Sequence, residues 1–366
     1  MKRVLFFGLL LTLLMAGAVQ AQDELPITLW IRGDLYSYET PGEAPVPLTS
    51  NGTISGPVLS PSGMQIAYKA ASPVGVDALN RVEADGFIAD FDLPGDIYIY
   101  DAASRASVQI AGQPADASLF VEGIADHATI RSAPVWSPDG SQLAWTEYDY
   151  PDGTPSIVVY NVANNAATPL VTDMPAPLVQ GAAPALRWGS SGFAVNASTD
   201  AAGEQDFLIY STDGTLVASP RLAPVPDDPA LEFLWVESPN GSLLGILYQS
   251  ARWTLLDGAI GVAVPVGELP RMTTDQADTR SLTFGVEEST GFFWEIVGET
   301  AAAAGSPTNV TLSPSGRQLA FIGFPSSGAV SVWTDGETTA IPNTGSNLDQ
   351  LQVGAVLWGY TYWRIG

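Results

Sequence analysis

Apolar and polar residues alternate in short runs along most of the chain, and this period of two predicts β-strands. The clearest runs flank a recurring stretch, which reads WSPDGSQLAW at residues 136–145 and has near copies at residues 59–68 and 312–321. A weaker copy covers residues 237–246, and residues 188–195 keep only its outline. Beyond the first 21 residues the apolar positions show no helical periodicity, so the pattern predicts an all-β protein.

Each copy has the residues of a tight turn between two strands. Proline sets φ near about −65° at the first central position, Asp, Ser or Asn suits the next, and glycine takes a position of positive φ. In the clearest copy these residues are Pro138, Asp139 and Gly140. The motif is therefore predicted to be a strand–turn–strand corner, whose residues serve backbone geometry and not ligand binding.

A further pair of predicted strands follows most corners. These pairs cover residues 95–110, 155–171, 206–219 and 328–342, each with a short polar turn. A corner and a hairpin together make a four-stranded antiparallel unit, and the units recur about every 50 to 75 residues. Repeated four-stranded sheets are typical of β-propellers, because radial closure buries both faces of each sheet.

The letters SPDG and QLAW, followed by the strand DIYIYD at residues 96–101, resemble the repeat of TolB-type β-propellers, which is related to the Trp-Asp (WD40-like) repeat. The resemblance extends over nearly the whole chain after residue 21. It implies a propeller fold and export from the cytoplasm; TolB itself works in an envelope complex. TolB carries an additional domain before its propeller, and since strands begin at about Ile27, we expect that domain to be absent.

Six blades are predicted. Corners occur at Ser60, Ser137, Ser190, Ser238 and Ser313, and residues 355–366 add a strand pair without the turn. Residues 279–299 are long enough for another hairpin, which leaves seven blades open. The N-terminal strands at residues 27–49 have no corner before them, and the C-terminal pair has no hairpin after it. We expect these strands to join in one blade, because folded proteins avoid unpaired sheet edges.

The first 21 residues have the pattern of a secretory signal peptide, with Lys2 and Arg3 before an apolar run and small residues before Gln22. We expect cleavage to leave one propeller domain, residues 22–366, in the periplasm or outside the cell. A retained N-terminal anchor is the alternative; no other segment is long enough to span a membrane. The chain has no cysteine, so disulfides do not stabilise this domain.

Loss of the two basic residues with the signal peptide changes the formal charge from −25 to −27. So acidic a surface repels nucleic acid, whose binding requires clustered basic side chains. It favours solubility and basic partners.

No catalytic set is evident. His127 is the only histidine, which excludes multi-histidine metal sites, and we expect it in an exposed polar loop. The adjacent carboxylates Asp227–Asp228 and Glu287–Glu288 do not show the facing geometry of a glycosidase pair. We therefore expect a non-catalytic binding scaffold without catalytic residues or a cofactor. Two alternatives stay open: a carbohydrate-active or other hydrolase with carboxylates at the channel mouth, and a propeller that escorts a peptidase on a separate chain.

A long acidic insertion lies between Tyr68 and Tyr98. Within it Asp90, Asp92 and Asp96 could supply oxygen ligands to Ca²⁺, with a solvated loop that binds no metal as the alternative. Functional residues favour loops on a rigid scaffold, so this insertion and residues 112–132 are where we expect ligand binding. The expected partner is a protein or glycan in the extracytoplasmic space, bound by a monomer.

Overall fold

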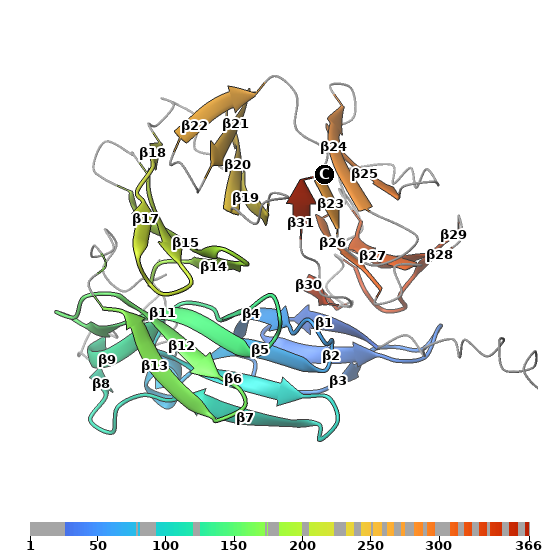
Figure 1. The fold of residues 1–366 in the computed structure, drawn as a ribbon. Helices are drawn as coiled ribbons and strands as arrows, with labels where there is room; N and C mark the ends of the chain where they lie inside the picture. Colours follow the sequence, from blue (N-terminus) through green and yellow to red (C-terminus); the bar gives the residue numbers. More distant parts are fainter. Residues whose placement is uncertain are drawn as a thin grey trace, which may run out of the picture.

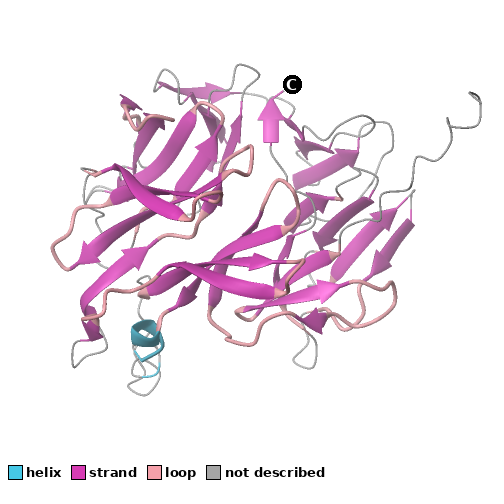
Figure 2. Cartoon of the chain, turned by 60° about the horizontal axis from the view of Figure 1, so that its bottom comes forward, coloured by secondary structure: helices cyan, strands magenta, loops and turns pink. Residues whose placement is uncertain are grey.

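In a computed structural model of the chain, nearly every regular element is a β-strand (Figure 1). The structure describes residues 26–77, 80, 93–119, 125–172, 174, 183–199 and 205–222. From there on it describes residues 232–237, 243–249, 252–257, 262–266, 272–274, 282–287, 291–296, 308–313, 318–323, 329–334, 337–345, 351–357 and 363–365. The all-β prediction is confirmed: among these residues, the helix turn at residues 73–77 and the adjoining residue 80 are the only helical positions (Figure 2).

The strands form six sheets, and most are antiparallel meanders that follow the chain. The first sheet contains β1 (Ile27–Ile31), β2 (Asp34–Tyr38), β3 (Val46–Pro47) and β30 (Val353–Leu357). The second contains β4 (Ile54–Leu59), β5 (Gln65–Ala71), β6 (Gly95–Asp101) and β7 (Ala106–Ala111). The third contains β8 (Ser118–Leu119), β9 (Ala125–Arg131), β10 (Val135–Trp136), β11 (Gln142–Tyr150), β12 (Ser156–Asn161) and β13 (Ala166–Val171).

The C-terminal half continues in the same way. The fourth sheet contains β14 (Leu186–Gly189), β15 (Gly192–Thr199), β16 (Gln205–Ser211), β17 (Leu216–Ala218) and β18 (Arg221–Leu222). An eight-stranded fifth sheet contains β19 (Glu232–Glu237), β20 (Leu243–Gln249), β21 (Arg252–Asp257), β22 (Val262–Val266), β23 (Met272–Thr274), β24 (Leu282–Glu287), β25 (Gly291–Ile296) and β31 (Trp363–Ile365). The sixth contains β26 (Thr308–Leu312), β27 (Gln318–Ile322), β28 (Val330–Thr334) and β29 (Glu337–Ala340).

The hydrophobic cores lie between successive sheets. Trp136 and Trp145 of the third sheet pack with Ile97 of the second, and Leu186 and Phe193 of the fourth sheet belong to the next core along the chain. Further cores join the first sheet to the second on one side and to the sixth on the other. The strands at one edge of these sheets contact each other, β10 with β4 and β14 and β26 with β30, whereas the strands at the opposite edge are largely exposed. The sheets are therefore arranged radially, with β4, β10, β14, β26 and β30 as inner strands.

The corner motifs are turns, as predicted. In the second sheet Gly63 has φ +73°, and its N–H donates to the carbonyl of Ser60 at 2.8 Å. In the third sheet Gly140 has φ +71°, and Ser137 N–H donates to Gln142 O at 2.9 Å. The Ser137 hydroxyl also donates to Asp139, and this bond holds the pKa of that carboxyl below its usual range. The turn residues form their hydrogen bonds with one another, which confirms that the repeat is a scaffold motif.

Replacing Gly140 by valine is expected to destabilise the fold by about 1–3 kcal/mol, because a β-branched residue is strained at positive φ. A Cβ atom here would also lie 3.2 Å from Cδ of Pro61, in the corner of the neighbouring sheet. The measurement is chemical denaturation of both proteins, with Gly140→Asn as the control, because asparagine tolerates this conformation. An unchanged midpoint at unchanged slope for the valine variant would contradict the turn assignment.

The predicted closure of the ring is confirmed by β30, which pairs antiparallel with β1 in the register Leu29↔Val356 and Trp30↔Ala355. Figure 1 shows that β30, near the C-terminus, lies beside β1, which is near the N-terminus. The expectation that both C-terminal strands enter this blade is wrong, because β31 lies between β19 and β23 in the fifth sheet. With β30, the first sheet already has four strands. In the fifth sheet β31 pairs with β19 on one side and with β23 on the other, so it covers the edge of each. The extra hairpin expected at residues 279–299 is present as β24 and β25; the number of blades stays a prediction.

Candidate functional site

The two ends of the second and third sheets differ in the length of their connections. In the meanders β4–β7 and β10–β13 the first and third connections lie at one end, where the corners at Ser60 and Ser137 and the short turn after β6 are closed by their own hydrogen bonds, such as Ser104 N–H to Asp101 Oδ1 at 2.8 Å. The other connections lie at the opposite end. There residues 72–94 join β5 to β6, residues 112–124 lead from β7 to β9, and residues 151–155 join β11 to β12. We call this second end the long-loop end.

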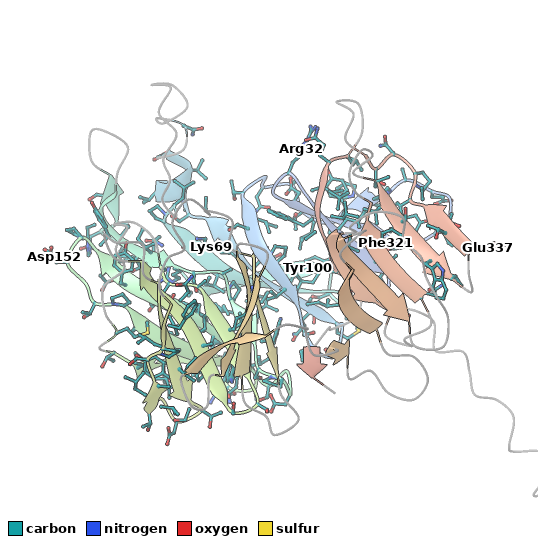
Figure 3. All side chains as sticks on the ribbon, turned by 90° about the horizontal axis from the view of Figure 1, so that it is seen from above. Arg32, Lys69, Tyr100, Asp152, Phe321 and Glu337 are labelled. Carbon is teal, nitrogen blue, oxygen red and sulfur yellow. The ribbon has the colours of Figure 1, made fainter. Side chains whose placement is uncertain are left out.

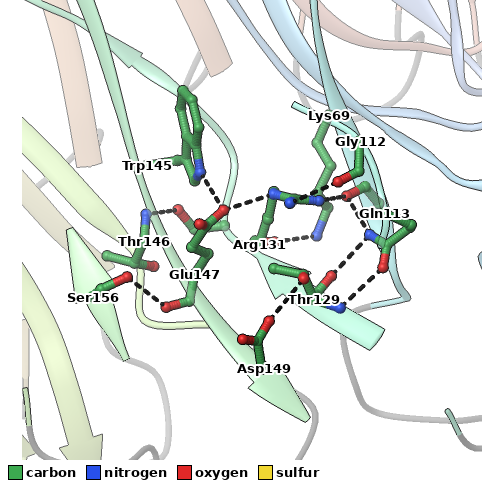
Figure 4. Close-up of polar contacts among 12 residues, drawn as sticks. Lys69, Gly112, Gln113, Thr129, Arg131, Trp145, Thr146, Glu147, Asp149 and Ser156 are labelled. Carbon is green, nitrogen blue, oxygen red and sulfur yellow. Dashed lines mark hydrogen bonds and ion pairs between the residues drawn. The ribbon is translucent and has the colours of Figure 1, made fainter. Parts of the chain in front are cut away.

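A buried polar cluster lies at the base of these long loops (Figure 4). We call it the polar junction; its residues are Lys69, Asp96, Gln113, Thr129, Arg131 and Glu147. The Arg131 guanidinium donates to Glu147 Oε2 at 2.8 Å, to Gly95 O at 3.0 Å and to Gly112 O at 3.0 Å. Arg131 is only 5% exposed. One side chain of β9 therefore holds the end of the acidic insertion, the start of the next long loop and strand β11 together.

Gln113 and Lys69 complete the connections between the second and third sheets. Gln113 Nε2 donates to Gly95 O at 3.0 Å and to Thr129 O at 2.9 Å, and its Oε1 accepts the N–H of Thr129 at 2.9 Å. Lys69 Nζ donates to the carbonyl of Arg131 at 2.9 Å. Figure 3 shows Lys69 toward the interior of the molecule and Asp152, at the end of the third sheet, toward the outside. Lys69, the only lysine after residue 21, is thus a structural side chain.

Asp96 has a buried carboxylate oxygen without a hydrogen-bond partner. It is 3% exposed, and its Oδ2 accepts a hydrogen bond from Gln109 Nε2 at 3.0 Å, whereas its Oδ1 is buried with no hydrogen-bond partner. Burial raises the pKa of this carboxyl, and the nearby Arg131 charge opposes the rise. The cluster holds two basic groups, Lys69 and Arg131, and two carboxylates, Asp96 and Glu147, so it is close to charge balance.

The chemistry of the junction is that of an anchor. Glu147 Oε2 accepts hydrogen bonds both from Arg131 and from Trp145 Nε1, the latter at 2.9 Å, so this carboxylate is engaged by the protein itself. A general acid or a nucleophile needs a carboxylate that is free to meet a substrate. The adjacent carboxylates noted above lie outside the described side chains.

The acidic insertion is ordered at its two ends. Ser72 caps a helix turn at residues 73–77: its hydroxyl accepts the N–H of Gly75 at 3.2 Å and donates to Pro94 O at 2.8 Å. The Ser72 N–H also donates to Pro94 O, at 2.9 Å. The base of the insertion is therefore held by the protein itself, since Pro94 O accepts two hydrogen bonds from Ser72.

The candidate calcium ligands are only partly described. Asp96 lies in the polar junction, whereas Asp90 and Asp92 fall outside the described residues. Within the part of the chain that the structure describes, no three metal-ligating side chains come together. The calcium site stays a prediction, which a calcium-dependent rise in melting temperature that is lost in Asp96→Asn would support.

His127 lies in a strand and not in a loop. It belongs to β9, pairs with Ser118 of β8, and its Nε2 lies 3.6 Å from Asp116 Oδ2. Its side chain is 44% exposed. A loop was predicted because the segment ADHATIR is polar at its start. In the structure the later residues of this segment pair with the end of β11.

The sequence pattern did not identify the residues that join the two segments expected to carry function. Residues 112–132 and the acidic insertion were both expected to carry function, and they meet through Arg131 and Gln113. A signal was present: Arg131 is a charged residue directly after the apolar Ile130 and shortly before the second corner, in a chain with few charged residues. A charge in such a position is normally paired when buried.

This protein is a β-propeller. Its four-stranded sheets are arranged radially with hydrophobic cores between them, and a C-terminal strand closes the N-terminal sheet. No helix within the described residues is long and apolar enough to cross a membrane.

Comparison with known proteins gives similarity in structure alone. No family model matches the sequence, and no curated protein matches it. TolB from Acinetobacter baumannii is 15% identical with a TM-score of 0.44, over 91% of this chain and 66% of the TolB chain. The β-propeller domain of the Trilobed protease from Pyrococcus furiosus is 13% identical with a TM-score of 0.44, over 81% of this chain and 85% of that domain. An oligogalacturonate lyase in complex with manganese is 12% identical with a TM-score of 0.46, over 79% of each chain. Identities and scores this low transfer neither an activity nor a partner, so the fold assignment rests on the sheet topology.

Proposed function

We propose that this protein is an exported, non-catalytic binding scaffold of the TolB-like kind, which receives a protein or glycan partner at its long-loop end. The observation that carries the proposal is the polar junction. It fixes the bases of two long loops to each other and to the third sheet, so that the loops are presented from a rigid support. A preorganised loop surface loses less conformational entropy on binding.

The charge at this end favours a basic partner. The exposed ionisable side chains described there include four acidic ones, Asp77, Asp116, Asp149 and Asp152, and the basic Arg32 in the turn after β1, whereas Lys69 and Arg131 are buried. With an overall formal charge near −27 after signal cleavage, the protein attracts basic surfaces over long range.

The test is capture of partners by the mature protein from an extracytoplasmic extract of its host. A double variant, Asp116→Lys with Asp152→Lys, is expected to lose most of the captured partner, because it reverses charge at the long-loop end. The matched control is Glu43→Lys with Glu337→Lys, which changes the net charge equally at exposed positions of the corner end. Treating the extract with protease or with periodate separates a protein partner from a glycan partner.

Equal retention by both double variants would contradict a binding site at the long-loop end. Turnover of a polysaccharide or peptide by the purified protein would contradict the non-catalytic part of the proposal. Light scattering of the mature protein checks the expected monomer.

A further inference from the structure

Comparison of equivalent positions in the corner repeat shows that one inner-strand residue, Arg187, is unusual. In four corners, the residue two positions before the corner serine or its equivalent lies on the inner strand opposite an alanine of the second strand. These pairs are Val58↔Ala67, Val135↔Ala144, Arg187↔Ala194 and Thr311↔Ala320. The shared register makes the four positions structurally equivalent. The weaker copy at residues 237–246 has Val236 at the corresponding place.

This position normally serves the core. Val135 is 8% exposed and packs between the third and fourth sheets, Thr311 is 5% exposed, and Val58 is half-buried against the core of the second and third sheets. Arg187, in contrast, is exposed. An arginine at a position that the repeat otherwise reserves for valine or threonine departs from the local rule, and such departures concentrate at functional sites.

Within the part of the chain that the structure describes, nothing compensates the charge of the Arg187 guanidinium. Among the described residues, no ion pair or hydrogen bond involves its side chain, although the protein has 39 acidic residues. Some surface of Arg187 reaches solvent, yet the surrounding protein excludes enough water that desolvation lowers the pKa of the group. Arg187 is thus exposed enough for a ligand to reach it, and its reduced hydration strengthens the attraction of the guanidinium for an anion.

We propose that Arg187 binds the carboxylate group of a ligand at the inner edge of the fourth sheet. The planar guanidinium presents paired N–H donors that match the two oxygens of a carboxylate. A singly charged group is favoured over a polyanion, because the protein's own negative charge repels each further charge on the ligand. Ala194 opposite Arg187 and Ala185 two residues before it are small, so neither neighbour fills the space beside the guanidinium.

This site is distinct from the long-loop end. Arg187 precedes the corner at Ser190 and Ser191 and therefore lies toward the end of the fourth sheet that carries the short turns. The polar junction lies at the opposite end of the second and third sheets. The inference therefore does not depend on the partner proposed above.

The test uses ligand pairs that differ only in the carboxylate, measured by isothermal titration calorimetry with the mature protein. Glucuronate is compared with glucose, to represent an acidic sugar, and N-acetylphenylalanine with its amide, to represent a chain end. We expect binding of at least one acid and at least tenfold weaker binding of its neutral counterpart. We also expect Arg187→Gln to reduce the affinity for that acid at least tenfold.

Two further variants separate binding from structure. Arg187→Val restores the residue that other copies carry, and we expect it to abolish carboxylate binding while raising the melting temperature. Arg105→Gln removes the same charge from an exposed site and is expected to leave binding unchanged. The proposal is overturned if the wild-type protein binds neither acid, if Arg187→Gln binds as well as the wild type, or if Arg105→Gln loses affinity equally. A lower melting temperature for Arg187→Val would assign the residue a structural role instead.

Discussion

Deletion of residues 355–366 is expected to unfold the whole propeller and not merely to shorten it. The deletion removes three of the five residues of β30, including Ala355 and Val356, which pair with Trp30 and Leu29 of β1. Val356 is 3% exposed and packs with Leu29 and Ile31 against Ile322 of the sixth sheet. Loss of this strand exposes the edge of β1 and opens the core between the first and sixth sheets.

The measurement is thermal unfolding together with limited proteolysis of the truncated protein. Deleting residues 363–366 alone is the control, because it removes β31 but leaves β30 and the closed first sheet in place. We expect the larger deletion to abolish the cooperative transition and the smaller one to keep the N-terminal sheets protease-resistant. A truncated protein lacking residues 355–366 that stayed monomeric, protease-resistant and as heat-stable as the parent would rule out closure by β30.

Replacing Arg131 by alanine is expected to destabilise the protein by about 3–5 kcal/mol, the range for breaking a buried ion pair from one side. The variant leaves Glu147 without its ionic partner and with only the hydrogen bond from Trp145, in a site where Arg131 itself is 5% exposed. It also removes the Arg131 hydrogen bonds to Gly95 O, which keeps the one from Gln113, and to Gly112 O. Denaturant titration of the purified variant measures the change.

Two other arginine variants serve as controls for the destabilisation expected of Arg131→Ala. Arg105→Ala removes an exposed ion pair to Glu39 at 3.3 Å, whose side chains are 70% and 49% exposed, and should change stability by about 0.5 kcal/mol or less. Arg131→Lys keeps the charge but not the fork that reaches three acceptors, so it is expected to recover only part of the loss. If Arg131→Ala were no worse than Arg105→Ala, the polar junction would not be the anchor of the long loops.

Much of the fold could be predicted because its rules are local. Pro138 and Gly140 specify a corner through the backbone angles they prefer, and the alternation of QLAW specifies a strand with one buried face. Repetition of the same turn then implied repeated sheets, and the unpaired strands at the two ends implied closure. The structure confirms these predictions in the turns at Gly63 and Gly140 and in the pairing of β1 with β30.

The candidate site could be predicted only as two segments. The residues that join them are far apart along the chain: Gly95 and Arg131 are 36 positions apart, and Lys69 and Arg131 are 62 positions apart. No periodicity or spacing encodes such contacts, because they depend on which loops the radial packing of two sheets places side by side. For the same reason His127 was expected in a loop, although it pairs with Ser118 of β8 at the start of the strand that continues beside β11.

The sequence by itself determined the class of fold, the chemistry of the turns, the acidic surface and the closure of the ring, since each depends on residues close together or on the two chain ends. The tertiary structure alone decided that β31 leaves the closing sheet, that Arg131 unites two long loops, and that Arg187 occupies a position equivalent to Val135. These three facts depend on pairing register and on packing between sheets. Both are fixed by the sum of many long-range contacts, to which any one stretch of sequence contributes only a part.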